Sequence, residues 1–86
     1  MTITRKDVAE KISAYLHHQI TLAELVNWAE NAMMEADFEE DDLATIRNAL
    51  SRLGLADIRE FGLLWEDCET ILRELGFTIR LEIVAA

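Results

Sequence analysis

The chain has 86 residues, of which 51% are hydrophobic and 29% are charged. This length fits one domain over residues 1–86 with one thin core, which leaves little room for a deep enzyme cavity. Eight Lys and Arg stand against seventeen Asp and Glu, so the net charge is −9 at pH 7. That charge argues against nucleic acid as a partner, and the apolar content argues against a disordered acidic tail. We therefore expect a folded, acidic module.

The cysteine content and the hydropathy pattern indicate where the protein works. Cys68 is the single cysteine, so the chain cannot form an internal disulfide of the kind that secreted small domains use. No apolar run approaches the roughly 18 residues of a membrane span, and the first residues carry no export pattern. We expect a cytoplasmic protein with no membrane partner.

Two capping boxes predict the first two helices. Thr4 with Asp7 precedes a helical pattern over residues 5–17, and Thr21 with Glu24 precedes a second one that begins at Leu22. In such a box, each of the two side chains satisfies a backbone amide of the other residue. Because the connection is only about four residues long, we expect an antiparallel helical hairpin.

Two glycines predict the ends of the third and fourth helices. Apolar residues at helical spacing begin at Leu43 and stop before Gly54, and a second set begins at Leu64 and stops before Gly76. Both glycines are expected to lie just after the helix in a Schellman motif, which needs a left-handed residue. The sequence thus predicts a mostly α fold, a small four-helix bundle.

After Gly76 the hydrophobic period changes from about 3.6 residues to two, which is typical of a β-strand. A strand must pair its backbone groups. The candidate partners are residues 1–4, residues 55–61, or a second copy of the chain, which would form a homodimer. The predicted strand consists of Thr78, Ile79, Arg80, Leu81, Glu82 and Ile83.

Most of the negative charge lies between residues 24 and 42, which hold eight acids and no base. Some of these acids precede the third helix, where the helix dipole favours carboxylates. The segment is therefore interpreted either as a solvated, helix-capping surface or as a docking surface for a basic protein, with an aromatic anchor. The predicted partner-binding residues are Trp28, Glu35, Asp37, Phe38, Glu39, Glu40, Asp41 and Asp42.

No catalytic, cofactor or metal site is predicted. Asp37, Glu39 and Asp41 match the first ligand positions of a calcium-binding loop, but Asp42 stands where that loop needs Gly and Asn48 where it needs Glu. His17 and His18 have no metal-ligand set around them. Cys68 lies on an apolar stripe between acids, which is the wrong setting for a nucleophile. We expect a protein that is not an enzyme.

The segment from Tyr15 to Leu25, with Ile20-Thr21-Leu22-Ala23-Glu24-Leu25 at its end, resembles the small helical immunity proteins of the colicin D type. The resemblance covers about residues 15–40. It implies a short, acidic, helical protein that blocks a basic nuclease toxin by imitating its nucleic-acid substrate. It assigns no toxin-contacting residue individually.

Two functions of different classes follow. The first is an immunity- or antitoxin-like inhibitor, which binds a basic protein through the acidic surface. The alternative is a self-associating structural or adaptor protein, which dimerises through residues 78–83 and has no inhibitor role.

Overall fold

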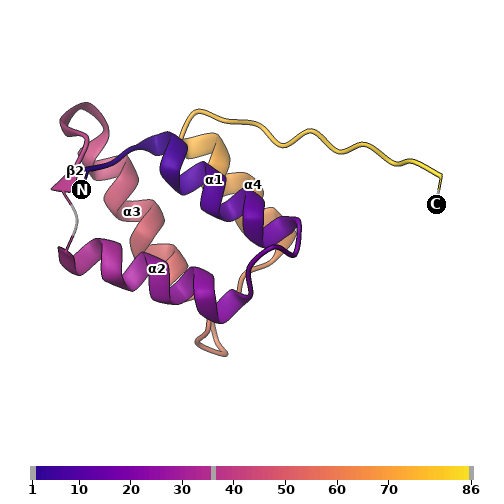
Figure 1. Ribbon diagram of the computed structural model, residues 1–86, viewed down its shortest axis with the longest axis horizontal. Coiled ribbons are helices and arrows are strands. Elements are labelled where there is room, and N and C mark those ends of the chain that lie inside the picture. Colours follow the sequence, from indigo (N-terminus) through magenta and orange to yellow (C-terminus); the bar gives the residue numbers. More distant parts are fainter. Residues whose placement is uncertain (1, 36, 86) are drawn as a thin grey trace.

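The structure is a computed structural model that describes residues 2–35 and 37–85. Within them the chain forms the helices α1 (Arg5–Leu16), α2 (Leu22–Glu35), α3 (Leu43–Gly54) and α4 (Trp65–Glu74) (Figure 1). Two strands, β1 (Thr2–Ile3) and β2 (Asp37–Phe38), and a short 3-10 helix, η1 (Glu40–Asp42), complete these elements. The mostly helical class is confirmed. The finer arrangement, a bundle that begins with an antiparallel hairpin of α1 and α2, stays a prediction.

Both predicted capping boxes are formed. The amide of Asp7 donates to Thr4 Oγ1 at 3.2 Å, and the amide of Thr4 donates to Asp7 Oδ2 at 2.9 Å. At α2, the amide of Glu24 donates to Thr21 Oγ1 at 3.1 Å, and the amide of Thr21 donates to Glu24 Oε1 at 3.0 Å. Each box satisfies two backbone donors that have no partner inside the helix.

The Schellman motif is confirmed at the end of α4. Gly76 has φ +93°, its amide donates to the carbonyl of Arg73 at 3.0 Å, and the amide of Phe77 donates to the carbonyl of Leu72 at 2.8 Å. These two bonds define the motif, and the left-handed residue at its turn favours glycine. The chain therefore reverses its direction directly after α4.

The same expectation at Gly54 is wrong. Gly54 is the last residue of α3, and its φ is not positive. The amides of Leu55 and Ala56 instead bond to carbonyls three residues back, so the chain tightens without a left-handed residue. α1 also ends in a Schellman motif: His18 has φ 60°, and the amide of Gln19 donates to the carbonyl of Ala14 at 2.8 Å.

A single apolar core joins the helices, and no polar or charged side chain of the described residues is buried in it. α2 makes its most extensive helix contact with α3. Leu43 and Leu64, which begin the apolar patterns of the last two helices, are 39% and 66% exposed instead of buried. The fully buried large side chains include Ile3, Val8, Ile12, Leu25, Val26, Ile46, Leu50, Leu53, Cys68 and Leu75.

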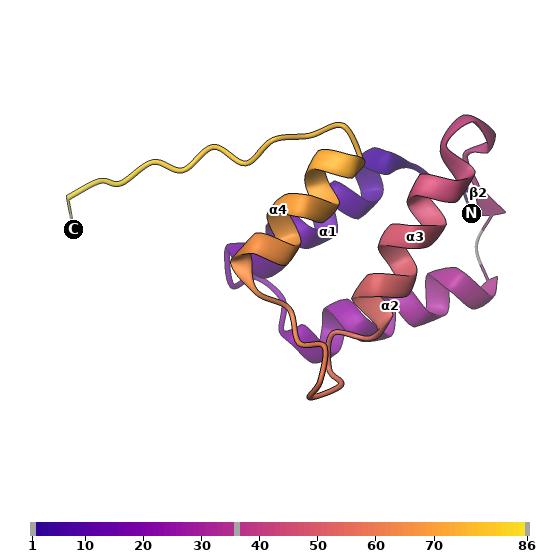
Figure 2. The same cartoon turned by 180° about the vertical axis from the view of Figure 1, so that it is seen from behind.

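The predicted pairing of the C-terminal strand with the N-terminal segment is wrong. β1 pairs with β2 in parallel, Thr2 opposite Asp37 and Ile3 opposite Phe38. The left-handed turn at Gly76 instead directs the C-terminal segment over α1 and α4. The segment after Gly76 runs along α1 and α4 and then leaves the body of the molecule, and it forms no strand over residues 78–85 (Figures 1 and 2). Pairing with a second copy stays a prediction.

Two arginines connect elements that lie far apart in the sequence. Arg5 Nε lies 2.9 Å from Asp42 Oδ2, and Arg5 Nη1 donates to the carbonyl of Leu75 at 3.1 Å. Arg52 Nη2 lies 3.2 Å from Asp67 Oδ2, and Arg52 Nη1 donates to the carbonyl of Gly62 at 3.0 Å. Arg5 thereby joins the start of α1 to η1 and to the end of α4, and Arg52 joins α3 to the start of α4.

Alanine should have opposite effects at the two glycines. In Gly76→Ala, the added Cβ would lie 2.7 Å from Arg5 Nη1 at a positive φ, so we expect a loss of about 1–2 kcal/mol in the free energy of unfolding. In Gly54→Ala, the nearest atom is Glu30 Cγ at 3.7 Å and the backbone is helical, so we expect a gain of about 0.5 kcal/mol. Urea denaturation measures both changes, and equal losses would contradict this account.

Candidate partner-binding surfaces

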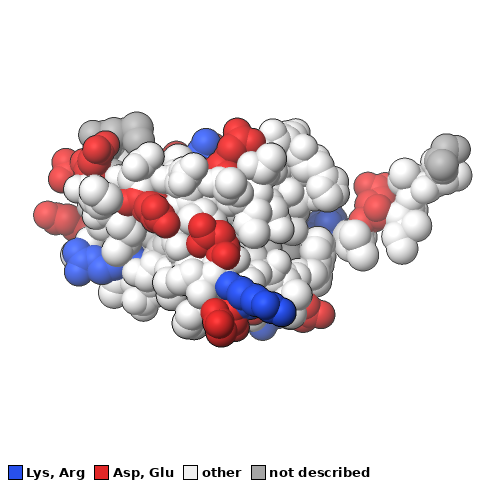
Figure 3. All heavy atoms as spheres, turned by 90° about the horizontal axis from the view of Figure 1, so that it is seen from below, with Lys and Arg blue, Asp and Glu red and all other residues white. Residues whose placement is uncertain are grey.

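The acidic side chains of residues 24–42 do not form one uniform surface. Acidic groups gather at the end of the molecule where β2 lies, and others are spread among basic and uncharged groups (Figure 3). Exposed side chains come from α2, β2 and η1, whereas Glu39 and Asp42 are half-buried. The exposed acids are Glu24, Glu30, Glu35, Asp37, Glu40 and Asp41.

Structural bonds occupy part of the predicted site. Asp42 is paired with Arg5, and the carboxylate of Glu24 accepts the amide of Thr21. The other exposed acids of the segment make no ion pair within the chain's described ranges, 2–35 and 37–85. Glu35, Asp37, Glu40 and Asp41 are therefore the predicted site acids whose charge is free for a partner.

The two predicted aromatic anchors lie partly in the core. Trp28 and Phe38 are half-buried and pack against the core cluster, and Lys11 Nζ lies 5.7 Å from the centroid of the Trp28 ring. Each ring therefore offers a partner only part of its surface. The sequence analysis missed two other apolar side chains beside the acids: Met33 and Met34 of α2 are 37% and 80% exposed.

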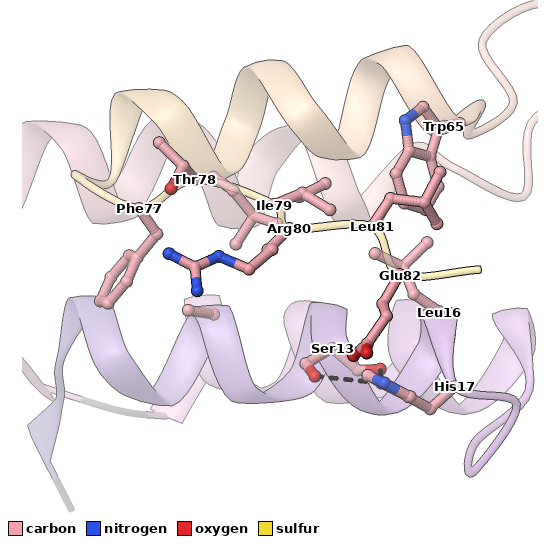
Figure 4. A pocket seen from close by; sticks show the side chains of 12 residues that line it. Ser13, Leu16, His17, Trp65, Phe77, Thr78, Ile79, Arg80, Leu81 and Glu82 are labelled. Atoms are coloured by element: carbon pink, nitrogen blue, oxygen red, sulfur yellow. Dashed lines mark hydrogen bonds between the residues drawn. The ribbon is translucent and has the colours of Figure 1, made fainter. Parts of the chain in front are cut away.

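A second surface is a groove of about 600 Å³ between α1 and α4. Leu16 of α1 and Trp65 and Leu72 of α4 are among its walls, and residues 77–82 run across it (Figure 4). Sequence reasoning could not find this groove, because its two walls are almost fifty residues apart in the chain. In the sequence, the exposed Leu64 next to Trp65 marked the start of α4 but not the groove itself.

Only some of the alternating apolar side chains of the C-terminal segment pack against the core. Phe77 and Ile79 pack against the core, but Leu81 and Ile83 are 71% and 88% exposed. In the described chain, no backbone hydrogen bond involves residues 78–85. An apolar stripe and a full set of backbone donors and acceptors thus remain open to a partner.

The histidine and cysteine side chains that could take part in a reaction or bind a metal have structural roles instead. His17 Nδ1 donates to the carbonyl of Ser13 at 2.8 Å, which satisfies the end of α1. Across the residues that the structure describes, no three His, Cys, Asp or Glu side chains come together as a metal site. The pKa of the Cys68 thiol is raised to about 11, mainly by burial and also by the charge of Asp67, while Arg52 partly opposes the increase.

Comparison with known proteins assigns no family: no protein-family model matches the chain, and no curated protein or solved structure matches it either. Among the described residues, no helix has both the length and the apolar character that crossing a lipid bilayer requires.

The raised pKa predicts that Cys68 reacts slowly. At pH 8 we expect a thiol reagent to modify the folded protein at least tenfold more slowly than the urea-unfolded chain, because the thiolate is the reactive form. Between the ordinary pKa of 9.0 and the folded value of about 11, only the unfolded chain releases the proton, so stability should fall as the pH rises through this range. Equal reaction rates for the folded and unfolded chains would contradict the burial of Cys68.

Proposed function

We propose that this protein is a small module that binds a basic protein, in the manner of an immunity protein or antitoxin. The observation that carries the proposal is the group of exposed carboxylates at the end of the molecule formed by β2, η1 and the last turn of α2: Glu35, Asp37, Glu40 and Asp41. The rest of the chain sums to only −1, so the negative field is concentrated in residues 24–42. A localised field of one sign steers a partner of the opposite sign and repels nucleic acid.

Apolar contact adds to this attraction. Met34 is 80% exposed and immediately precedes Glu35, so a partner drawn to the carboxylates also meets an adaptable apolar side chain. Charge would then govern how fast the complex forms, and apolar contact how long it lasts. Trp28 and Phe38 contribute the exposed parts of their rings. The single cysteine suits a cytoplasmic site of action.

Neutralising the exposed acids should slow binding. We would replace Glu35 and Glu40 by Gln and Asp41 by Asn, and compare this triple variant with Glu60→Gln/Glu66→Gln/Glu74→Gln, which removes equal charge from exposed positions elsewhere. The partner is first captured from the source cells and identified by mass spectrometry, and association rates are then measured against salt. We expect about a tenfold slower association and a shallower salt dependence for the first triple variant only. Equal rates for both triple variants would sink the proposal.

A second candidate function is self-association as a structural or adaptor protein, through the C-terminal residues 78–83. It is favoured by the exposure of Leu81, Ile83 and Val84, at 71%, 88% and 74%, on a segment whose backbone groups make no hydrogen bond within the described chain. An extended segment of this kind can pair with the same segment of a second copy and form a dimer.

Truncation tests the second candidate. A chain that ends at Arg80 keeps Phe77 and Ile79, which pack against the core, and loses the exposed apolar residues. We expect the full chain to sediment as a dimer at high micromolar concentration and the truncated chain as a folded monomer, with its helical circular dichroism unchanged. A truncated chain that keeps the mass of the full chain would exclude dimerisation through this segment.

A further inference from the structure

The C-terminal segment has two chemically different faces. Ile79, Leu81 and Ile83 lie on one face of an extended chain, because successive side chains point to opposite sides. Arg80 and Glu82 lie on the other face, and both are exposed. The segment thus carries one positive and one negative charge, two residues apart, around the central Leu81.

This pattern selects one antiparallel register between two copies. With Leu81 opposite Leu81 of the second copy, Arg80 lies opposite Glu82 and Ile79 lies opposite Ile83. A shift by two residues would place Arg80 opposite Arg80, or Glu82 opposite Glu82. A shift by one residue would place apolar residues opposite charged ones. Directly opposite side chains attract when their charges differ and repel when they are alike, so only the register centred on Leu81 has both faces matched.

The extent of the helical body also favours a two-fold axis at Leu81. Ile79 is half-buried, whereas Leu81 is 71% exposed and Ile83 is 88% exposed, so the body ends beneath about Leu81. The ribbon diagram also shows that the C-terminal segment continues beyond the ends of the helices (Figure 1). A two-fold axis at Leu81 would therefore place two bodies next to each other. An axis nearer to Gly76 would make them overlap.

A second strand would lie beside the chain's own residues 77–82, which line the groove between α1 and α4. Ile79 lines this groove together with Leu16, Trp65 and Leu81 (Figure 4). In the Leu81-centred register, Ile83 of the second copy lies next to Ile79 and covers the apolar walls. Trp65 and Leu64, at 42% and 66% exposure, lie at the end where the two bodies meet.

We propose that two copies of this chain form a two-fold symmetric dimer by antiparallel pairing of residues 78–84 around Leu81, with reciprocal Arg80–Glu82 pairs and with Ile83 of each copy over the α1–α4 groove of the other. This inference rests on the second candidate function, self-association through the C-terminal strand, and it names the register and the receiving surface.

Charge reversal tests the register. Arg80→Glu places Glu opposite Glu82 twice in the dimer, and Glu82→Arg places Arg opposite Arg80 twice. The double variant Arg80→Glu/Glu82→Arg restores both attractive pairs. By sedimentation equilibrium, we expect each single variant to dimerise about tenfold more weakly and the double variant to dimerise within about twofold of the natural chain. The double variant is the control for folding, because it contains both substitutions.

Crosslinking gives a second measurement that does not depend on charge. Leu81→Cys should form a disulfide-linked dimer on mild oxidation, because residue 81 faces itself across the axis. Ile83→Cys alone should not, because it faces Ile79, but Ile79→Cys/Ile83→Cys should. Cys68 is buried and stays out of the reaction.

The outcomes separate the register from self-association itself. If the full chain dimerises and truncation after Arg80 abolishes the dimer, but charge reversal has no effect and Leu81→Cys does not crosslink, the register is wrong and strand-mediated dimerisation stands. If the full chain is monomeric at millimolar concentration, or if the truncated chain remains a dimer, both are overturned. Weakened single variants, a restored double variant and a Leu81→Cys crosslink support the proposal.

Discussion

The structure depends on burial of one apolar face from each helix in a core that holds no polar or charged side chain among the described residues. A chain this short has little apolar surface to bury, so an unpaired buried charge would cost a large part of its stability. Every ionisable group other than Cys68 must therefore find its place at the surface or in partial burial. This constraint explains why the carboxylates are found at the ends and outer faces of the helices.

The fold then divides the acidic residues between structural and free ones. Asp7, Glu24 and Asp67 each accept the amide of the residue at the start of their helix. Asp42 and Asp67 also pair with Arg5 and Arg52. Carboxylates that serve as caps or ion-pair partners are fixed in position, so they contribute less to the capture of a second protein. The unpaired acids at the β2 end keep their charge free, and there they lie close together.

The C-terminal segment follows from the stop at Gly76. The left-handed residue turns the chain back along α1 and α4, and Phe77 and Ile79 attach it to the core. Its alternation continues past the end of the body, so the same pattern that packs Ile79 leaves Leu81 and Ile83 exposed. The two candidate surfaces lie on different elements, and a dimer formed through the segment would leave Glu40 and Asp41 of η1 free for another partner.

Local features were predictable because their partners are close in sequence. The boxes at Thr4 and Thr21 and the stop at Gly76 each join residues no more than five positions apart, and the structure confirms them. The stop at Gly54 was wrong, because α3 closes without a left-handed residue. The equivalent stop at His18 was missed, because a non-glycine residue occupies the left-handed position there.

The sequence by itself determined the helical class, the helix starts and the total charge, since these depend on short-range spacing and composition. Only the tertiary structure decided which acids are free of ion pairs. Asp42, for example, is paired with Arg5, which lies far from it in the sequence. It also decided that β2 pairs with β1, through two residues from each strand, a pairing too short to leave a periodic signal. The groove likewise exists only because packing brings α1 beside α4, and no local pattern encodes that approach.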